Sequence, residues 1–375
     1  MQIKTKKYII ACVCQKKAVL LRRKSEIMAN TFGDKWSFTS FGESHGVAIG
    51  GVLDGVPAGL PIDFALIREE LERRKGMRKQ DGSSNLQDAA LQVGVSPRAL
   101  REPDEVEWLS GVMPIHNAQC TIHNENLVTL GTPIAFIIRN KDARPEDYEW
   151  LKNSYRVGHA DKVYEQKYGI RDWRGGGRAS ARETAARVVA GCIAKQELAQ
   201  KGISIHAELI QVGAETNPER FAETIAAYQR EGDSIGGIVE CRIQGLPVGV
   251  GEPIFGKLQA ELAYAIMSIN ACKGFEYGTG FGGVTQPGSE INHISGGIAG
   301  GISDGSEIVF RCVFKPTAST PKALEEFTIL IPEGERLLHN AQFKMNKGRH
   351  DACVAVRAVP VVEAMTALAL ANIMR

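Results

Sequence analysis

The residues best suited to chemistry lie in a run of arginine and glycine, Arg174 to Thr184. Its three consecutive glycines can adopt positive φ and leave their N–H groups uncovered. Ser180 and Glu183 have the spacing of a capping box, which predicts that a helix begins there. Backbone N–H groups, the positive end of a helix and guanidinium groups all bind phosphate. We therefore expect a phosphate site here. A capped surface helix with solvated arginines is the alternative.

Two histidines lie in polar turns that contain glycine. His45 belongs to the segment Gly42 to Gly46, and His159 follows Gly158. A histidine in an open turn can donate or accept a proton near neutral pH. With the arginines nearby, the two residues predict acid–base chemistry on a phosphorylated molecule. A structural role for each histidine is the alternative.

The segment Gly42 to Gly46 also has the spacing of a hydrolase nucleophile elbow, with Ser44 as the nucleophile. That motif requires a helix directly after the serine. Residues 47–54 are instead typical of a strand and a turn. A serine hydrolase is therefore the weaker interpretation.

Two further charged groups could take part in chemistry. A basic cluster, Arg73 to Arg78, ends an amphipathic segment and could form a flap over an anionic substrate or a solvated helix end. Asp351 follows Arg349 and His350, so it should be ionised. An ionised carboxylate in a cleft can act as a base, and one half of a structural ion pair is the alternative.

The composition narrows the class of protein. The chain has 375 residues, 45 basic and 43 acidic side chains, and a net charge of +2. A net charge this small does not indicate a broad basic surface for nucleic acid. The single arginine–glycine run also lacks the repetition of an RNA-binding segment. We therefore expect a small-molecule partner. The eight cysteines form no Cys-x-x-Cys pair, which favours a reducing cytoplasm. His116, Cys120 and His123 lack a second cluster, and we expect no metal.

Alternating strands and helices must position these residues. Period-two apolar patterns predict strands at 36–41, 47–54, 132–139, 203–212, 236–243 and 308–315. Helical spacing predicts helices at 63–74, 148–155, 180–200, 217–230 and 257–270, and a buried terminal helix beyond Pro360. The run Gly278 to Gly283 matches a dinucleotide fingerprint, but it follows a helix, so we reject a Rossmann site. The order of elements permits a doubly wound α/β fold or an α+β fold.

Residues 1–29 are expected to be an N-terminal extension, either disordered or translated from an upstream start codon, and residues 30–375 a single domain. The extension carries basic side chains around the apolar run Tyr8 to Cys14. That run is far shorter than the roughly 20 residues needed to cross a bilayer. A targeting peptide is the alternative.

Seven segments together resemble the chorismate synthase family. They are Gly42 to Gly46, Arg156 to Asp161, Tyr164 to Gly169, Arg174 to Thr184, Met267 to Ala271, Lys315 to Thr317 and Gly348 to Asp351. The resemblance runs in order from about Asn30 to the C-terminus. It implies an α+β fold, with helices sandwiched between antiparallel β-sheets in a single domain, and assembly as a homotetramer.

The resemblance implies a lyase of the shikimate pathway. Its reaction is a 1,4-anti elimination that converts 5-enolpyruvylshikimate 3-phosphate to chorismate and phosphate, in aromatic amino acid biosynthesis. It uses reduced FMN (FMNH2), although no net redox change occurs. Either NADPH or an external flavin reductase would supply the electrons. We expect a cytoplasmic enzyme without a nucleic-acid or membrane partner.

The resemblance also implies roles for individual residues. His45 would protonate the departing phosphate, His159 would keep the flavin in its reactive protonation state, and Asp351 would help to remove the ring proton, with Ser44 in support. The positions that match flavin-binding residues are Arg178, Ala179, Ser180, Asn270, Ala271, Gly300, Lys315, Pro316, Thr317, Ala318, Ser319 and Arg349. Those that match ligands of a substrate or NADP phosphate are Arg74 and Arg78.

Two segments depart from the family pattern. Residues 79–101 and 113–130 are longer than we expect for the family, and Lys75 stands where arginine is usual. The segments that carry the chemistry are intact. The expansions lie near the expected flap, so we expect any effect to be on closure over the substrate.

Overall fold

The computed structural model describes residues 30–76, 94–95, 103–114, 127–156, 158–290, 295–318, 320–322, 329–330, 337–338 and 351–375. The expected N-terminal extension, the His116, Cys120 and His123 group and most of the two expanded segments lie outside these residues. The same is true of Arg78, Ser319 and Arg349.

The first sheet has five antiparallel strands in the order β1-β2-β3-β8-β5. The strands are β1 Thr31–Phe32, β2 Ser37–Phe41, β3 Ala48–Asp54, β5 Val106–Ser110 and β8 Ile134–Arg139. Phe38 lies opposite Leu53 in the register, and both side chains are buried. Since alternate residues of a strand face one side of the sheet, this register turns the apolar face toward the helices.

The second sheet has four antiparallel strands in the order β11-β14-β10-β9. They are β9 Ser204–Val212, β10 Gly237–Gln244, β11 Cys272–Tyr277 and β14 Ile308–Phe314. Strand β10 alternates between buried and half-buried residues, as the sequence predicts for a sheet with one face on the core.

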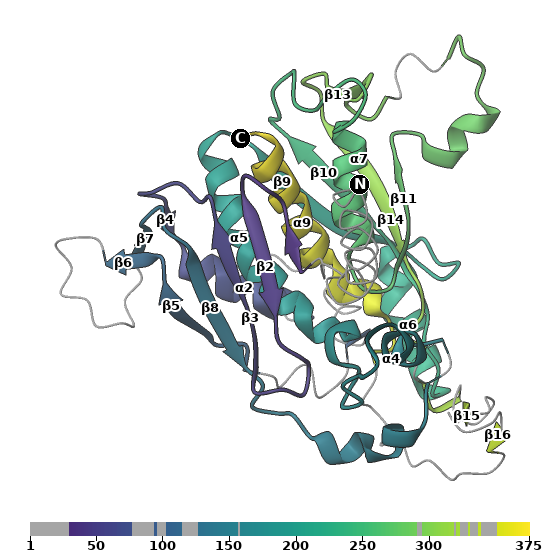
Figure 1. Ribbon diagram of the computed structural model, residues 1–375. Helices are drawn as coiled ribbons and strands as arrows, with labels where there is room; N and C mark the ends of the chain where they lie inside the picture. Colours follow the sequence, from purple (N-terminus) through teal and green to yellow (C-terminus); the bar gives the residue numbers. More distant parts are fainter. Residues whose placement is uncertain are drawn as a thin grey trace, which may run out of the picture.

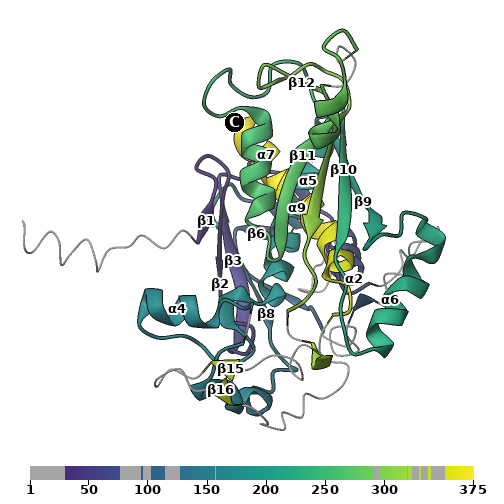
Figure 2. The same cartoon turned by 90° about the vertical axis from the view of Figure 1, so that its right-hand side faces the viewer.

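Helices fill the space between the two sheets (Figures 1 and 2). Helix α5, Thr184–Gln200, contacts β2 and β3, and α9, Val354–Ile373, contacts β9, β10 and β14. These two helices pack against each other, with α2, Phe64–Arg74, beside both. The α+β expectation is confirmed. A doubly wound fold would need a parallel sheet, whereas every strand pair described here is antiparallel.

Smaller elements complete the described part of the chain. The short strands are β4 Pro61–Ile62, β6 Val112–Pro114, β7 Leu127–Thr129, β12 Ile298–Ala299, β13 Ile302–Ser303, β15 Ile329–Leu330 and β16 Leu337–Leu338. The further helices are α4 Asp161–Tyr168, α6 Phe221–Arg230 and α7 Leu258–Met267. The 3₁₀ turns are η2 Pro145–Asn153, η3 Gly177–Ala179, η4 Ala181–Glu183, η5 Pro218–Arg220 and η6 Gly280–Thr285.

Helix α9 lies at the centre of the core. Among the helices of the described residues, α9 is the one that is long and apolar enough to cross a membrane. However, 94% of its most apolar stretch is buried inside the protein. Its place between the sheets makes it a core helix. The expected boundary was wrong, because α9 begins at Val354 and Pro360 lies inside it. Proline lacks an N–H donor, and burial of nearly the whole helix holds it together at that residue.

A buried ion-pair network joins three helices. The carboxylate of Glu363 in α9 contacts Arg73 of α2 at 2.9 Å and Lys195 of α5 at 2.6 Å. Burial alone would raise the pKa of Glu363, but Lys195 and Arg73 outweigh burial and hold this pKa well below its usual range. The network sets the positions of the three helices, since a buried charge is stable only beside its partners.

The crossing of α5 and α9 depends on Gly191. A Cβ atom at this position would lie 2.3 Å from Cα of Ala364. We expect Gly191→Ala to lower the free energy of unfolding by about 1–3 kcal/mol, because overpacking outweighs the gain in helix propensity. Urea unfolding followed by circular dichroism measures this change.

The control is Gly282→Ala, since a Cβ atom at Gly282 meets nothing within 4 Å. The control should unfold like the parent protein. A Gly191→Ala protein as stable as the parent would contradict this account of the helix crossing.

Candidate active site

The loop from Gly175 to Gly177 brings the two histidines together. All three glycines have positive φ, with values of 63°, 91° and 54°. A Cβ atom on Gly175 would lie 2.1 Å from Nδ1 of His45, and one on Gly176 would lie 3.0 Å from Cε1 of His159. The two imidazoles therefore pack on adjacent residues of one loop, and a side chain on Gly175 or Gly176 would displace one of them.

His45 lies in a turn at the end of β2. The Oγ atom of Ser44 is 3.1 Å from Nδ1 of His45 and donates a hydrogen bond to the carbonyl oxygen of Gly175 at 3.3 Å. The ring of Tyr148 meets the imidazole edge-on, with 4.7 Å between centroids. The turn leads into β3, so the helix that a hydrolase elbow requires is absent at this position.

His159 belongs to a charged triad with Arg156 and Asp161. Its Nδ1 atom is 2.9 Å from Oδ1 of Asp161 and 3.1 Å from Nη2 of Arg156, and Arg156 pairs with Asp161 at 2.8 Å. Burial lowers the pKa of His159, and the charge of Arg156 adds to this, while Asp161 partly opposes both. The imidazole is therefore held in its neutral form at neutral pH.

The start of α5 follows the sequence prediction in part. Ser180 caps the short turn η4, and its Oγ atom accepts a hydrogen bond from the N–H of Arg182 at 3.3 Å. Helix α5 then begins at Thr184. Glu183 pairs with Arg187 one turn later in α5. The cap is thus present as expected, and the glutamate stabilises the first turn of the helix through an ion pair.

Arg178 ties this loop to the first sheet. Its Nη2 atom donates to Oγ of Ser40 at 2.6 Å, and its Nη1 atom donates to the carbonyl oxygen of Gly42 at 3.3 Å. These bonds fix the end of β2 and therefore the entry to the His45 turn.

Asn270 and Ala271 join two more of the predicted segments. The Nδ2 atom of Asn270 donates to the carbonyl oxygen of Ala179 at 2.9 Å. Ala271 has φ of 67°, the one positive value among non-glycine residues of the described chain. Its carbonyl oxygen accepts from the N–H of Lys315 at 3.0 Å. Strain of this kind costs about 1–3 kcal/mol and is concentrated at functional sites.

Residues 315–318 connect Asp351 to His159. The Oγ1 atom of Thr317 donates to the carbonyl oxygen of Asp351 at 3.0 Å. Ala318 lies beside Gly158, since a Cβ atom on that glycine would be 3.6 Å from Cβ of Ala318. The Asp351 carboxylate pairs with Nη1 of Arg357 at 3.2 Å. Pro316 lies within the same segment. Residues 315–318 thus contact residues far away in the sequence, at Gly158 and at Asp351.

Gly300 lies apart from this cluster. It occupies the turn between β12 and β13, and its neighbour Gly301 accepts from the N–H of Leu258, the first residue of α7. Asn270 lies beyond the other end of the same helix. Within one chain, Gly300 and Asn270 are therefore about 15 Å or more apart along the helix axis.

Arg74, which matches a ligand of a substrate or NADP phosphate in the family, lies at the end of α2. Its side chain is fully buried, where Nε donates to Oγ1 of Thr184 at 2.9 Å and Nη2 donates to the carbonyl oxygen of Ala181 at 2.8 Å. It also pairs with Asp104 at 3.5 Å. These contacts make Arg74 a support for the start of α5.

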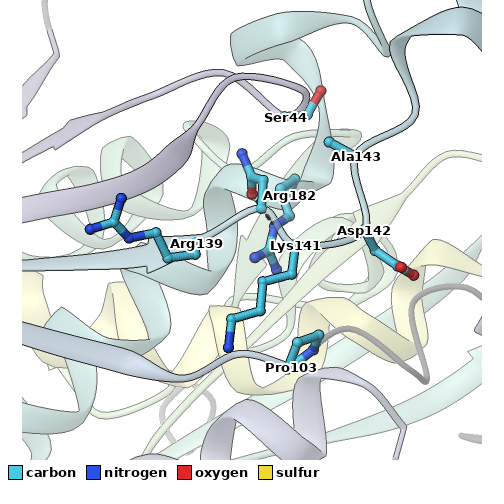
Figure 3. Close-up of a pocket in the computed structure, with 8 residues that line it drawn as sticks. Ser44, Pro103, Arg139, Lys141, Asp142, Ala143 and Arg182 are labelled. Carbon is cyan, nitrogen blue, oxygen red and sulfur yellow. Dashed lines mark hydrogen bonds between the residues drawn. The ribbon is translucent and has the colours of Figure 1, made fainter.

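A cavity lies beside Ser44 at the edge of the cluster (Figure 3). Its lining is mostly polar and basic. The lining residues are Ser44, Pro103, Arg139, Asn140, Lys141, Asp142, Ala143 and Arg182. In the described part of the chain, no group of three or more metal-ligating side chains was found.

Two groups that shape the site were not predicted from the sequence. Asp161 holds His159, and its position two residues after that histidine is a signal that could have identified it. Asn140 contacts the His45 turn from the end of β8. Nothing in the local sequence marks Asn140, because it meets the turn only in the folded protein.

Together these features define a class of protein: an α+β protein in which a glycine-rich loop holds two histidines and in which a carboxylate lies on a neighbouring segment. The model of the chorismate synthase family matches residues 36–374. The chain is 44% identical to the chorismate synthase of Christiangramia forsetii, over 92% of this chain and 96% of that protein. It is 45% identical to that of Parabacteroides distasonis, over 91% and 96%. The fold is also similar to a crystal structure of chorismate synthase, with a TM-score of 0.64 and 26% identity. The match covers 92% of this chain and 92% of the chain in that structure.

The chain therefore belongs to the chorismate synthase family. It is a lyase of the shikimate pathway that converts 5-enolpyruvylshikimate 3-phosphate to chorismate, in aromatic amino acid biosynthesis. The family uses reduced FMN.

The first test of the site concerns the protonation of His159. Its pKa should lie below the ordinary value of about 6.5, and Asp161→Asn should lower it further because the carboxylate stabilises the charged ring. NMR titration of the ring nitrogens measures both values, with His159→Asn to assign the resonance. A midpoint above the ordinary value would contradict this electrostatic account.

The second test concerns the glycine loop. Gly175→Ala places a methyl group against His45 and should lower kcat about 100-fold, since a displacement of about 1 Å can cost that much. Gly169→Ala is the matched control, because Gly169 also has positive φ, 75°, but a Cβ atom there meets nothing within 4 Å. Chorismate formation measures the activity of both variants. Equal loss in the two variants would show that backbone strain alone is responsible.

Proposed function

We propose that the cluster around the Gly175–Gly177 loop is the catalytic site of this lyase and that it binds reduced FMN together with the substrate. The observation that supports this most directly is the packing of His45 and His159 on adjacent glycines. Two acid–base groups then share one glycine-lined face.

The described residues fit a flavin. A hydrogen bond joins Asn270 to Ala179. Two more hydrogen bonds join Lys315 to Ala271 and Thr317 to Asp351. Three segments that match the family's flavin positions thus meet in one chain, and Asp351 is joined to them. Burial lowers the pKa of Lys315, and the charge of Lys273 adds to this. Two nearby ammonium groups favour an anionic ligand such as the phosphate of FMN.

We assign the proton transfers to three side chains. His45, held by Ser44, protonates the departing phosphate. Neutral His159, oriented by Asp161, would keep a bound reduced flavin in its reactive protonation state. Asp351 helps to remove the ring proton through its carboxylate, which Arg357 holds in place. The chemistry that bound reduced FMN would supply is transient electron donation, with no net redox change.

The remaining flavin and phosphate contacts extend the same proposal. Arg178 and Ser180, just before α5, and Pro316 and Ala318 would also contact the flavin. Ser319 and Arg349, which lie outside the described residues, match flavin positions of the family as well. We propose Arg78 as a ligand of the substrate or NADP phosphate. Arg74 would contribute through the α5 start that it supports.

We further propose a homotetramer. Large apolar side chains are exposed beside β12 and β13 and around η6: Val248, Ile254, Phe255, Phe281 and Val284. Exposed apolar patches of this kind favour association between copies. The position of Gly300 in the same region supports a flavin contact made by a neighbouring copy. We also propose a cytoplasmic location, with NADPH or an external flavin reductase as the source of electrons.

Anaerobic phosphate release from 5-enolpyruvylshikimate 3-phosphate tests the assignments. With reduced FMN the parent protein should release phosphate, and with oxidised FMN alone it should not. His45→Ala should lower kcat by about 10²–10⁴, the usual contribution of a general acid. Asp351→Asn should also lower kcat.

A comparison with NADPH and oxidised FMN, with and without a separate reductase, identifies the electron source.

Retention of full kcat by His45→Ala would contradict the assignment of His45. Covalent labelling of Ser44 by a fluorophosphonate would instead favour hydrolase chemistry.

A further inference from the structure

His45 occupies the centre of a four-residue turn. The N–H of Gly46 donates to the carbonyl oxygen of Glu43 at 3.0 Å, which closes the turn around Ser44 and His45. The N–H of Ser44 also donates to the carbonyl oxygen of Gly177 at 3.4 Å. The direction of the imidazole therefore depends on this bond and on how the ends of the turn are held.

Asn140 holds both ends of this turn. It directly follows β8, and its Nδ2 atom donates to the carbonyl oxygens of Glu43 and Gly46, each at 3.0 Å. Its backbone N–H donates to the carbonyl oxygen of Val47 at 3.1 Å. One residue therefore makes three hydrogen bonds to the segment that carries His45.

The orientation of the Asn140 amide is determined by its other partner. Its Oδ1 atom accepts from Nε of Arg182 at 3.0 Å, and arginine can only donate hydrogen bonds. Arg182 is in turn held by a buried ion pair with Asp104, whose pKa it and Arg74 hold below the usual range against the effect of burial. The NH2 group of Asn140 must then face the two carbonyl oxygens.

We propose that Asn140 is a positioning residue for the reaction, acting through His45. Through its hydrogen bonds, Asn140 links Arg182, in the arginine–glycine segment, to the turn that carries His45. Ser44 and Arg182 line the same cavity (Figure 3). This inference rests on the catalytic role proposed above for His45.

Asn140→Asp is the decisive variant. An aspartate keeps an acceptor for Arg182 but replaces both N–H donors by an oxygen that faces two carbonyl oxygens. A purely structural bridge between β8 and Arg182 would survive this change. Positioning of His45 would not, so we expect kcat to fall about 100-fold with little change in KM. Asn140→Ser, which is neutral and too short to span both carbonyl oxygens, should show the same loss. Because serine is neutral, a loss of kcat in this variant would come from the missing N–H donors and not from an added negative charge.

Asn372→Ala is the matched control. The Oδ1 atom of Asn372 accepts from the N–H groups of Asp34, Lys35 and Trp36, so it also fastens a backbone segment, but in another part of the fold. Its removal should lower thermal stability and leave kcat unchanged. The second readout is the NMR resonance of the His45 ring in protein without cofactor. It should move in Asn140→Asp and Asn140→Ser and stay in place in Asn372→Ala.

The outcomes separate this inference from the proposed function. Wild-type kcat and an unmoved His45 resonance in both Asn140 variants, with an inactive His45→Ala, would overturn the role of Asn140 alone. Full activity of His45→Ala would overturn the catalytic assignment and, with it, the positioning role of Asn140. A moved resonance with low kcat in both Asn140 variants supports the inference.

Discussion

The site depends on a stretch of backbone that has no side chains. Gly175 to Gly177 pass between the two histidines with positive φ, and a single methyl group on Gly175 would overlap His45. Glycine relieves both constraints, because it tolerates positive φ and occupies the least space. The close approach of two acid–base groups is therefore a property of the loop, and the surrounding elements serve to hold this loop in place.

The supports of the loop reach into the core. Arg182, just before α5, and Arg74, the last residue of α2, share the buried carboxylate of Asp104. Further along, Glu363 joins α9 to α2 and α5 through Arg73 and Lys195. Removing one partner from such a network leaves a buried charge uncompensated and costs about 3–5 kcal/mol. The helices that carry the site are thus held in place by charges as well as by apolar packing.

Much of the fold and the site could be predicted from local patterns. Strands β2, β3, β8, β10 and β14 and helices α2, α5, α6 and α7 follow from apolar periodicity, and Ser180 follows from the chemistry of capping. The sheet order and the boundary of α9 did not follow from the sequence. Periodicity says which face of an element is apolar, and it does not say which element covers that face. Pro360 suggested a helix start that burial overrides.

The sequence by itself determined which chemical groups are present: two histidines in glycine turns, a carboxylate among basic residues and a glycine–arginine loop. Only the tertiary structure decided which of them meet. It places Arg74 under α5, sets Gly300 at the far end of α7 from the cluster, and brings Asn140 to the His45 turn. The physical reason is that hydrogen bonds and ion pairs act over about 3–4 Å in space. Separation along the chain does not determine that distance.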